Sequence, residues 1–146
     1  MTGATTVGST GPARRVRLVL AAVVVVATAC GCGAPRERID GASAVASSFA
    51  EAARSGDGTA MCALLARGTR EELARSEGTT CDKAVVEQRL STVGPVREVD
   101  VHGLRAMARF EGDTLFLSRF STGWKVVAAG CVPRPGQPYR CRVKGG

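Results

Sequence analysis

A stripe of apolar residues at helical spacing lies between Asp40 and Gly56. Asp40 is a favourable N-cap, and Gly56 is the residue type that most often follows the end of a helix. Between them, apolar side chains recur every three or four residues, which places them on one face of an amphipathic helix. The positions in this stripe are Ala42, Val45, Ala46, Phe49, Ala52 and Ala53.

Three shorter helices are expected before the Gly94-Pro95 pair ends the helical region. The second helix takes Asp57 as its N-cap. The third begins with the capping box Thr69-x-x-Glu72, and the fourth begins at residue 79 or 80. The apolar positions of these helices are Met61, Leu64, Leu65, Leu73, Val85, Val86 and Leu90, and Gly68 and Gly78 are expected to end the second and third.

Beyond residue 95 apolar and polar positions alternate, which is typical of strands. Four strands are expected, at 96–102, 104–110, 114–120 and 124–131. Short turns between them imply an antiparallel meander. The prolines of the tail remove strand donors, so no further strand is expected there. Helices followed by strands predict an α+β fold in which the helices cover one face of a curved four-stranded sheet.

The first 32 residues have the pattern of a bacterial lipoprotein signal. Arg14, Arg15 and Arg17 precede an apolar run at residues 18–29, and small residues then precede Cys30 and Cys32. A positive start, a short apolar segment and small residues at the cleavage site define a secretory signal. As a helix the run would extend only about 18 Å, short of the ~30 Å hydrocarbon core, so a permanent transmembrane helix is disfavoured.

This pattern predicts export and acylation of one cysteine, with the protein held on the outer face of the cytoplasmic membrane by its acyl chains. Cleavage before Cys32 leaves an even number of other cysteines, which favours Cys32, while Cys30 fits the motif nearly as well. Ordinary cleavage near Ala29, with a soluble secreted product, is the alternative. The expected division is a signal peptide at 1–31, a tether at 32–39 and a domain at 40–146.

Four further cysteines are expected to form disulfides, because thiols oxidise outside the cytoplasm. Three pairings are possible, and we expect the sequential one, Cys62–Cys81 and Cys131–Cys141. Each bond should stabilise the domain by roughly 2–4 kcal/mol. None of the four lies in a Cys-x-x-Cys pair and His102 is the only histidine, so no metal site and no redox motif are predicted.

The charge balance is modest once the signal is removed. Three of the 20 basic residues and none of the 13 acidic ones precede Cys32, so the mature chain carries four positive charges in excess. A nucleic-acid-binding domain would show a concentrated basic face with aromatic residues, and the chain has one Trp and scattered basic residues. Nucleic acid is therefore not an expected partner, and solubility is the simplest role of the surplus.

Several short motifs together resemble a known fold. The segment 49–53 (Phe-Ala-Glu-Ala-Ala), the pairs Gly56-Asp57 and Leu64-Leu65, and the closing segment 123–127 (Gly-Trp-Lys-Val-Val) are similar to the cone domain of the nuclear-transport-factor-2-like superfamily. The mature chain, over roughly residues 40–142, resembles small lipoproteins of high-GC Gram-positive bacteria. Their shared segments are Ser-Gly-Asp-Gly at 55–58, Cys-Ala-Leu-Leu at 62–65 and Ala-Ala-Gly-Cys at 128–131. The resemblance implies a cone-like domain but no single activity, because this fold hosts isomerases, cyclases, dehydratases, transport factors and binding domains.

Candidate catalytic chemistry is limited to Asp100 and His102. They are two residues apart on one expected strand and so share a face. A histidine beside a carboxylate can act as a general base, whereas on a solvated face the same pair has no chemical role. No cofactor motif accompanies them, because the glycine-rich segment at 55–58 lacks the preceding strand and the following Lys of a phosphate-binding loop.

Arg105 and Arg109 are the candidate ligand-binding residues, and Arg119 joins them in one of the possible strand registers. Such a row can hold an anion or the carboxylates of a partner, or it can form a solvated face with ion pairs. Five larger apolar side chains could line a cone pocket or belong to the core. They are Met107, Phe110, Phe116, Phe120 and Trp124.

These features predict a membrane-anchored extracytoplasmic lipoprotein. Since the chain combines an anchor with a stable domain and little acid–base chemistry, we expect a non-catalytic binding or accessory module of the cell envelope, with an envelope protein or a small ligand as partner. The alternatives are a small isomerase, cyclase or hydrolase on the same fold, and a protein-interaction domain without a pocket.

Overall fold

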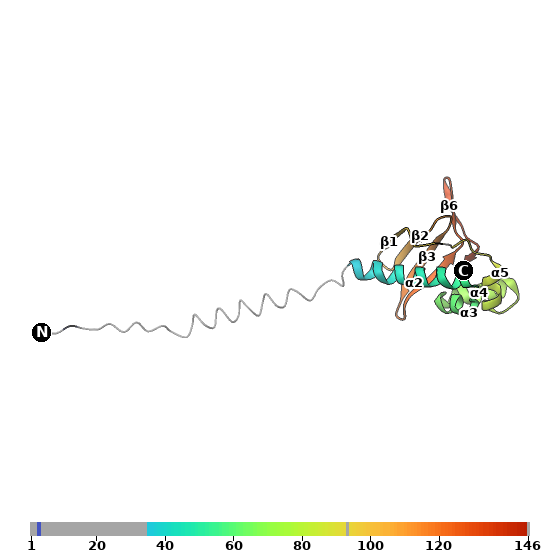
Figure 1. The fold of residues 1–146 in the computed structure, drawn as a ribbon, viewed down its shortest axis with the longest axis horizontal. Coiled ribbons are helices and arrows are strands. Elements are labelled where there is room, and N and C mark those ends of the chain that lie inside the picture. Colours follow the sequence, from blue (N-terminus) through green and yellow to red (C-terminus); the bar gives the residue numbers. More distant parts are fainter. Residues whose placement is uncertain (1–2, 4–34, 93, 146) are drawn as a thin grey trace. The chain divides into compact units, whose positions relative to one another are not determined.

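The computed structural model describes residues 3, 35–92 and 94–145, so Cys30 and Cys32 lie outside the described residues. From residue 35 onwards the chain forms an α+β domain in which all described helices precede the strands (Figure 1). The predicted α+β class, with helices before strands, is thus confirmed. Among the helices described, none is long and apolar enough to cross a bilayer. These helices are α2 (Pro35–Ser55), α3 (Gly58–Leu64), α4 (Arg67–Glu77) and α5 (Cys81–Glu87).

The long helix α2 begins at Pro35, so the prediction of an N-cap at Asp40 is wrong. Proline suits the first helical position because its missing N–H would have no partner there and its φ is already helical. Residues 35–39, expected as tether, therefore form the first turns of α2. The apolar stripe itself is confirmed. Its fully buried members are Ala42, Ala46 and Phe49.

The helix α4 begins at Arg67, so the prediction of a capping box at Thr69 is also wrong. Thr69 is buried, and its hydroxyl donates to the carbonyl of Val127 in the sheet at 3.3 Å. Leu65, expected to continue the second helix, instead has an extended conformation and bridges Val126. Hydrogen bonds to the sheet edge thus override the local capping signal, because a Thr hydroxyl bonds whichever backbone group it can reach.

The main sheet has five antiparallel strands in the order β1-β2-β3-β4-β7, and β5 and β6 form a separate two-stranded ribbon. The strands are β1 (Glu98–His102), β2 (Arg105–Arg109), β3 (Thr114–Phe120), β4 (Gly123–Ala129), β5 (Val132–Arg134), β6 (Gln137–Arg140) and β7 (Val143–Lys144). The first four strands form the expected meander, with an irregularity in β3 between Phe116 and Leu117. The expected number of four is wrong, because β7 pairs with the free edge of β4.

The proline-rich tail forms strands, although the sequence predicted none. Pro133 lies in β5 and Pro138 lies in β6. In a two-stranded ribbon both strands are edges, so a residue without an N–H can face solvent there without losing a ladder bond. The tail therefore makes a hairpin, called the β5–β6 hairpin below, before the chain returns to add β7 to the main sheet.

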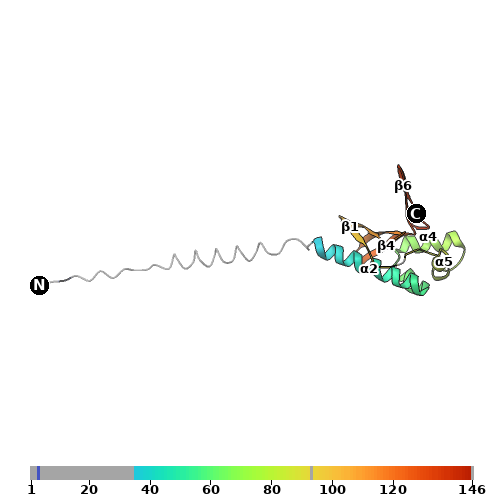
Figure 2. The ribbon, with the colours of Figure 1, turned by 45° about the horizontal axis from the view of Figure 1, so that its top comes forward.

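The two faces of the main sheet have different environments. The inner face packs beneath α2 and is filled by fully or nearly fully buried side chains, namely Ala106, Ala108, Leu115, Leu117 and Val126. The opposite, outer face carries the alternate residues, among them Glu98, Asp100, His102, Arg105, Met107, Arg109, Phe116 and Ser118. The β5–β6 hairpin rises on the side away from α2 (Figure 2).

The four described cysteines form the two expected disulfides. Cys62 at α3 is bonded to Cys81 at α5, and Cys131 after β4 is bonded to Cys141 before β7. The first bond joins two short helices that have little core of their own. The second closes the base of the β5–β6 hairpin. Both reduce the entropy of the unfolded chain and so stabilise the folded one.

Candidate functional site

Asp100 and His102 share the outer face of the edge strand β1, as their spacing predicts. In the antiparallel pairing of β1 and β2, Asp100 lies opposite Met107 and His102 lies opposite Arg105. Both side chains are on the side away from α2, outside the layer between helices and sheet. Within the described part of the chain no hydrogen bond joins the Asp100 carboxylate to the His102 ring. The structure therefore does not form the carboxylate–histidine pair that would let His102 act as a general base.

Asp100 is instead paired with Arg109. The Asp100 Oδ2 lies 3.2 Å from Arg109 Nη2, and Arg109 Nη1 donates to Glu98 on the same strand as Asp100. The hydrogen bond to the Glu98 carboxylate, with smaller contributions from Asp100 and the Tyr139 hydroxyl, raises the pKa of the Arg109 guanidinium. The three charged groups are partly exposed, so the cluster orders the surface and adds little to stability.

The sheet register separates the three candidate arginines. Arg105 and Arg109 lie on the outer face of β2, four residues apart. Arg105 faces Ser118 across β3, whereas Arg119 pairs with Trp124 and so belongs to the other face. Arg105 and Arg119 take part in none of the ion pairs formed among described residues. The row that the sequence left open therefore contains Arg105 and Arg109 but not Arg119.

The β5–β6 hairpin contacts the outer face through an aromatic pair. The rings of Tyr139 in β6 and Phe116 in β3 meet edge to face, with centroids 5.1 Å apart and planes at 81°. Edge-to-face packing is a favoured geometry for aromatic pairs. Tyr139 also contributes slightly to the raised pKa of the Arg109 guanidinium, which agrees with a position of the hairpin near the charged cluster. Tyr139 was not a candidate from the sequence. Its position between Cys131 and Cys141, which are bonded to each other, was the sequence feature that could have indicated its role.

The C-terminal segment of the chain, residues 114–146, is strongly basic. Residues 114–146 contain six Lys or Arg and no Asp or Glu. Arg134 and Arg140 are exposed on the β5–β6 hairpin, and Arg142 donates to the carbonyls of Gln88 and Arg89 at 2.8 and 2.9 Å. This asymmetry is visible in the sequence, but only the fold shows that part of it lies on a protruding hairpin (Figure 1).

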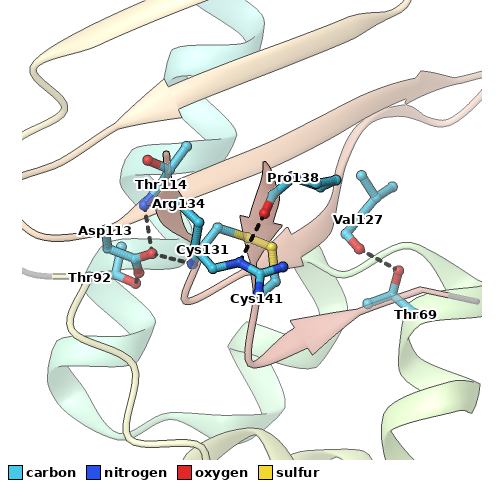
Figure 3. Close-up of a disulfide and its surroundings, with 9 residues drawn as sticks. All are labelled: Thr69, Thr92, Asp113, Thr114, Val127, Cys131, Arg134, Pro138 and Cys141. Atoms are coloured by element: carbon cyan, nitrogen blue, oxygen red, sulfur yellow. Dashed lines mark hydrogen bonds between the residues drawn. A yellow bond between two sulfur atoms is a disulfide. The ribbon is translucent and has the colours of Figure 1, made fainter. Parts of the chain in front are cut away.

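A buried carboxylate lies beside the Cys131–Cys141 disulfide (Figure 3). Asp113 is only 4% exposed. Its Oδ1 accepts from the N–H groups of Thr114 and Cys131 at 2.6 and 2.9 Å, and its Oδ2 accepts from the Thr92 hydroxyl. Burial raises the pKa of the Asp113 carboxyl, although these hydrogen bonds and the charge of Arg142 act in the opposite direction. Each hydrogen bond described for the Asp113 carboxylate is donated by another group of the protein. Asp113 therefore has a structural role at the base of the hairpin.

The large apolar candidates do not line one pocket. Phe110 and Trp124 are buried in the core, Met107 and Phe116 lie on the outer face, and Phe120 is 48% exposed. A surface hollow of about 440 Å³ lies beside Phe120, and its lining includes Thr69, Val127, Ala128 and Lys144. The described residues that line this hollow include no carboxylate or histidine side chain.

Neither a metal site among the described residues nor a related protein indicates a function for this domain. Within residues 35–92 and 94–145, no three His, Cys, Asp or Glu side chains are disposed to hold a metal ion. No family model, curated protein or solved structure matches the chain.

Proposed function

We propose that the protein is an exported, acyl-anchored binding module of the cell envelope, without catalytic activity, that holds an anionic partner on its β5–β6 hairpin. The observation that carries the binding part is the basic, acid-free C-terminal segment, part of which is displayed on a protruding hairpin closed by a disulfide. The lipoprotein signal pattern supports the anchor, with Cys32 or Cys30 as the acylated residue.

The disulfides support export. Both bonds join cysteines that are well separated in sequence, by 19 and 10 residues, and both connect elements that pack together. Such bonds persist in oxidising compartments and are rare in the cytosol of most organisms. Their formation agrees with a signal that sends the domain across the membrane.

The packing of the sheet supports a binding role over an enzymatic one. Catalytic residues are usually found in concave sites that exclude water. Here the inner face is filled by side chains of the core, and Asp100 is engaged by Arg109 on the exposed outer face. A long helix that packs on an antiparallel sheet, with the buried Trp124 in its fourth strand, also supports a cone-like domain of the nuclear-transport-factor-2-like type.

The hairpin suits a role as a binding element because its shape is held from both sides. The Cys131–Cys141 bond closes its base, and Tyr139 packs against Phe116 on the sheet. Preorganisation lowers the entropy cost of binding. Arg134 and Arg140 would then meet carboxylates or phosphates of the partner with little rearrangement.

Acylation is tested by growing the native host with labelled fatty acid and expressing the wild-type chain, Cys30→Ser and Cys32→Ser. We expect label on the wild type and its loss in Cys32→Ser alone. Loss in Cys30→Ser alone would move the anchor to Cys30, and an unlabelled wild type would overturn the anchor. A thiol count on the unreduced mature protein is an independent measure: Cys32 as anchor leaves no free thiol, and Cys30 leaves one.

Binding is tested with polyglutamate as an acidic probe and the full mature protein. We expect Arg134→Glu/Arg140→Glu to weaken binding by about tenfold or more at low salt. The matched control, Arg54→Glu/Arg67→Glu, changes the net charge equally on the helices and should bind within about twofold of the wild type. Equal losses in both variants would show a response to net charge alone and would overturn the hairpin as the binding element.

A further inference from the structure

Three exposed large apolar side chains lie at one end of the domain. All described residues with exposed large apolar side chains are Ile39, Leu104, Phe120, Val86 and Val132. The first three lie at the end formed by the start of α2, the β1–β2 turn and the β3–β4 turn, called the turn end below. Leu104 is 62% exposed and Phe120 is 48% exposed, more than the other three.

The two turns lie side by side because β1, β2, β3 and β4 are consecutive antiparallel neighbours. The N–H of Arg119 donates to the carbonyl of Leu104 at 2.8 Å, which joins the β1–β2 turn directly to the last residues of β3. Phe120 is the next residue, and it pairs with Gly123 across the β3–β4 turn. Leu104 and Phe120, 16 residues apart in sequence, therefore lie at adjacent turns, and the register directs their side chains to opposite faces of this rim of the sheet.

The start of α2 lies at the same end. A Cβ on Gly41 would come within 3.1 Å of the Trp124 ring, so the second turn of α2 lies directly on the first residues of β4. Ile39 occupies the helical position that continues the buried stripe of Ala42 and Ala46 toward the start of the helix. There it is 37% exposed. Figure 1 shows α2 beginning at the end of the domain away from the β5–β6 hairpin.

Arginines surround these apolar residues. The exposed arginines at this end are Arg36, Arg38, Arg105 and Arg119. None of them belongs to an ion pair between described residues, whereas the acidic residues of the same segments are only Glu37 and Asp40. Exposed apolar side chains ringed by cations are the composition of surfaces that lie on anionic lipid, because the apolar groups enter the interface while the cations meet phosphates.

We propose that the turn end lies on the phospholipid surface of the membrane to which the protein is anchored, and that anionic headgroups are its ligand. The inference rests on the proposed acyl anchor. Pro35 is the third residue after Cys32, and three residue steps span at most about 11 Å. An acyl chain on Cys32 therefore holds the start of α2, and with it Leu104 and Phe120, within reach of the headgroups.

The same geometry directs the β5–β6 hairpin away from the lipid. The β3–β4 turn and Cys131 lie at opposite ends of β4, whose seven residues span roughly 20 Å. The turn end thus faces the bilayer while Arg134 and Arg140 stay available to an anionic partner. This arrangement explains why the exposed apolar groups and the hairpin arginines occupy different ends of a small domain.

The test uses the full mature lipoprotein in vesicles of phosphatidylcholine, with and without phosphatidylglycerol. A nitroxide is placed at Thr122→Cys in the β3–β4 turn, and the control label is placed at Gln137→Cys in the hairpin; both positions are exposed. We expect the Thr122 label to lose about tenfold of its accessibility to a water-soluble relaxation agent when phosphatidylglycerol is present. The Gln137 label should remain accessible in both vesicles.

A second set of variants separates docking from anchoring. Leu104→Ser/Phe120→Ser and Arg105→Glu/Arg119→Glu should each restore access to the Thr122 label, while Arg54→Glu/Arg67→Glu should not. Mass spectrometry of the N-terminus reports acylation independently. Equal accessibility of the Thr122 and Gln137 labels in acylated protein overturns the docking and leaves the anchor standing. If the chain carries no acyl group, shielding of Thr122 on phosphatidylglycerol vesicles still upholds the docking, and no shielding overturns both.

Discussion

The carboxylate of Asp113 accepts a hydrogen bond from the backbone N–H of Cys131, 18 residues away, at 2.9 Å. This contact joins the β2–β3 turn to the residue at which the β5–β6 hairpin begins. The hairpin base is therefore held twice, by a covalent bond to Cys141 and by a buried carboxylate. A buried acceptor with several donors is costly to remove, because each donor is then left without a partner.

Replacing Asp113 with alanine should lower the free energy of unfolding by about 3 kcal/mol. The N–H groups of Thr114 and Cys131 and the hydroxyl of Thr92 would all lose their acceptor. Asp113→Asn is the control: its carbonyl can accept from both N–H groups and its amide can donate to the Thr92 oxygen, so it should stay within about 1 kcal/mol of wild type. Urea unfolding with the disulfides intact measures both, and equal stability of the two variants would refute the structural role.

The stability contributed by Asp113 should fall as pH rises. Burial raises the pKa of this carboxyl above the ordinary 3.8, so between the two values the folded state binds the proton more tightly than the unfolded state. The contribution is complete below the ordinary pKa and is lost as pH rises through the folded-state pKa. The difference in unfolding free energy between wild type and Asp113→Asn, measured by urea at several pH values from about 3.5 to 7, should therefore decrease with pH. An increase would contradict the raised pKa.

Gly58→Ala should destabilise the domain by roughly 1–3 kcal/mol. A Cβ at Gly58 would lie 2.0 Å from the backbone carbonyl oxygen of Asp82, so α3 and α5 could not keep their present separation. Gly68→Ala is the matched control, since Gly68 lies in α4 with open space around its would-be Cβ. That change should be neutral or stabilise by up to about 1 kcal/mol through helix propensity. Thermal unfolding of the two variants compares them, and similar losses would refute the close contact.

Tyr139 and Phe116 should show a coupling energy of about 0.5–1.5 kcal/mol in a double-mutant cycle of alanine substitutions. Their edge-to-face contact is the aromatic link between the β5–β6 hairpin and the sheet. Unfolding free energies of the wild type, both single variants and the double variant give the coupling. The cycle of Tyr139 with Phe120, which lies at the other end of β3, should give a value near zero. Equal coupling in both cycles would contradict a specific contact.

The helices and first four strands could be predicted because their apolar periods are local. Phe49 and its stripe on α2, and the alternation along β2, lie on the expected faces. Predictions failed where a tertiary partner competed with a local signal. Thr69 satisfies a sheet carbonyl in place of capping a helix, and the prolines of the tail are tolerated because both strands of that hairpin are edges.

The candidate site was predictable only in part. Asp100 and His102 share a face because strand periodicity is two, and this requires no knowledge of the partner strand. Whether Arg119 joins Arg105 depends on the pairing of β2 with β3, since a shift of one residue moves a side chain to the opposite face. Asp113 was missed because burial of a polar turn residue depends on the segments that return over it.

The sequence by itself determined the order of helices and strands, the disulfide candidates and the charge of each segment, since periodicity, spacing and charge are properties of neighbouring residues. Only the tertiary structure decided that the tail supplies a fifth strand and a hairpin, that Asp113 bonds Cys131, and that the turn with Leu104 lies beside the end of β3. Each of these depends on contacts between distant segments, whose geometry is set when the whole chain packs and cannot be obtained from local patterns.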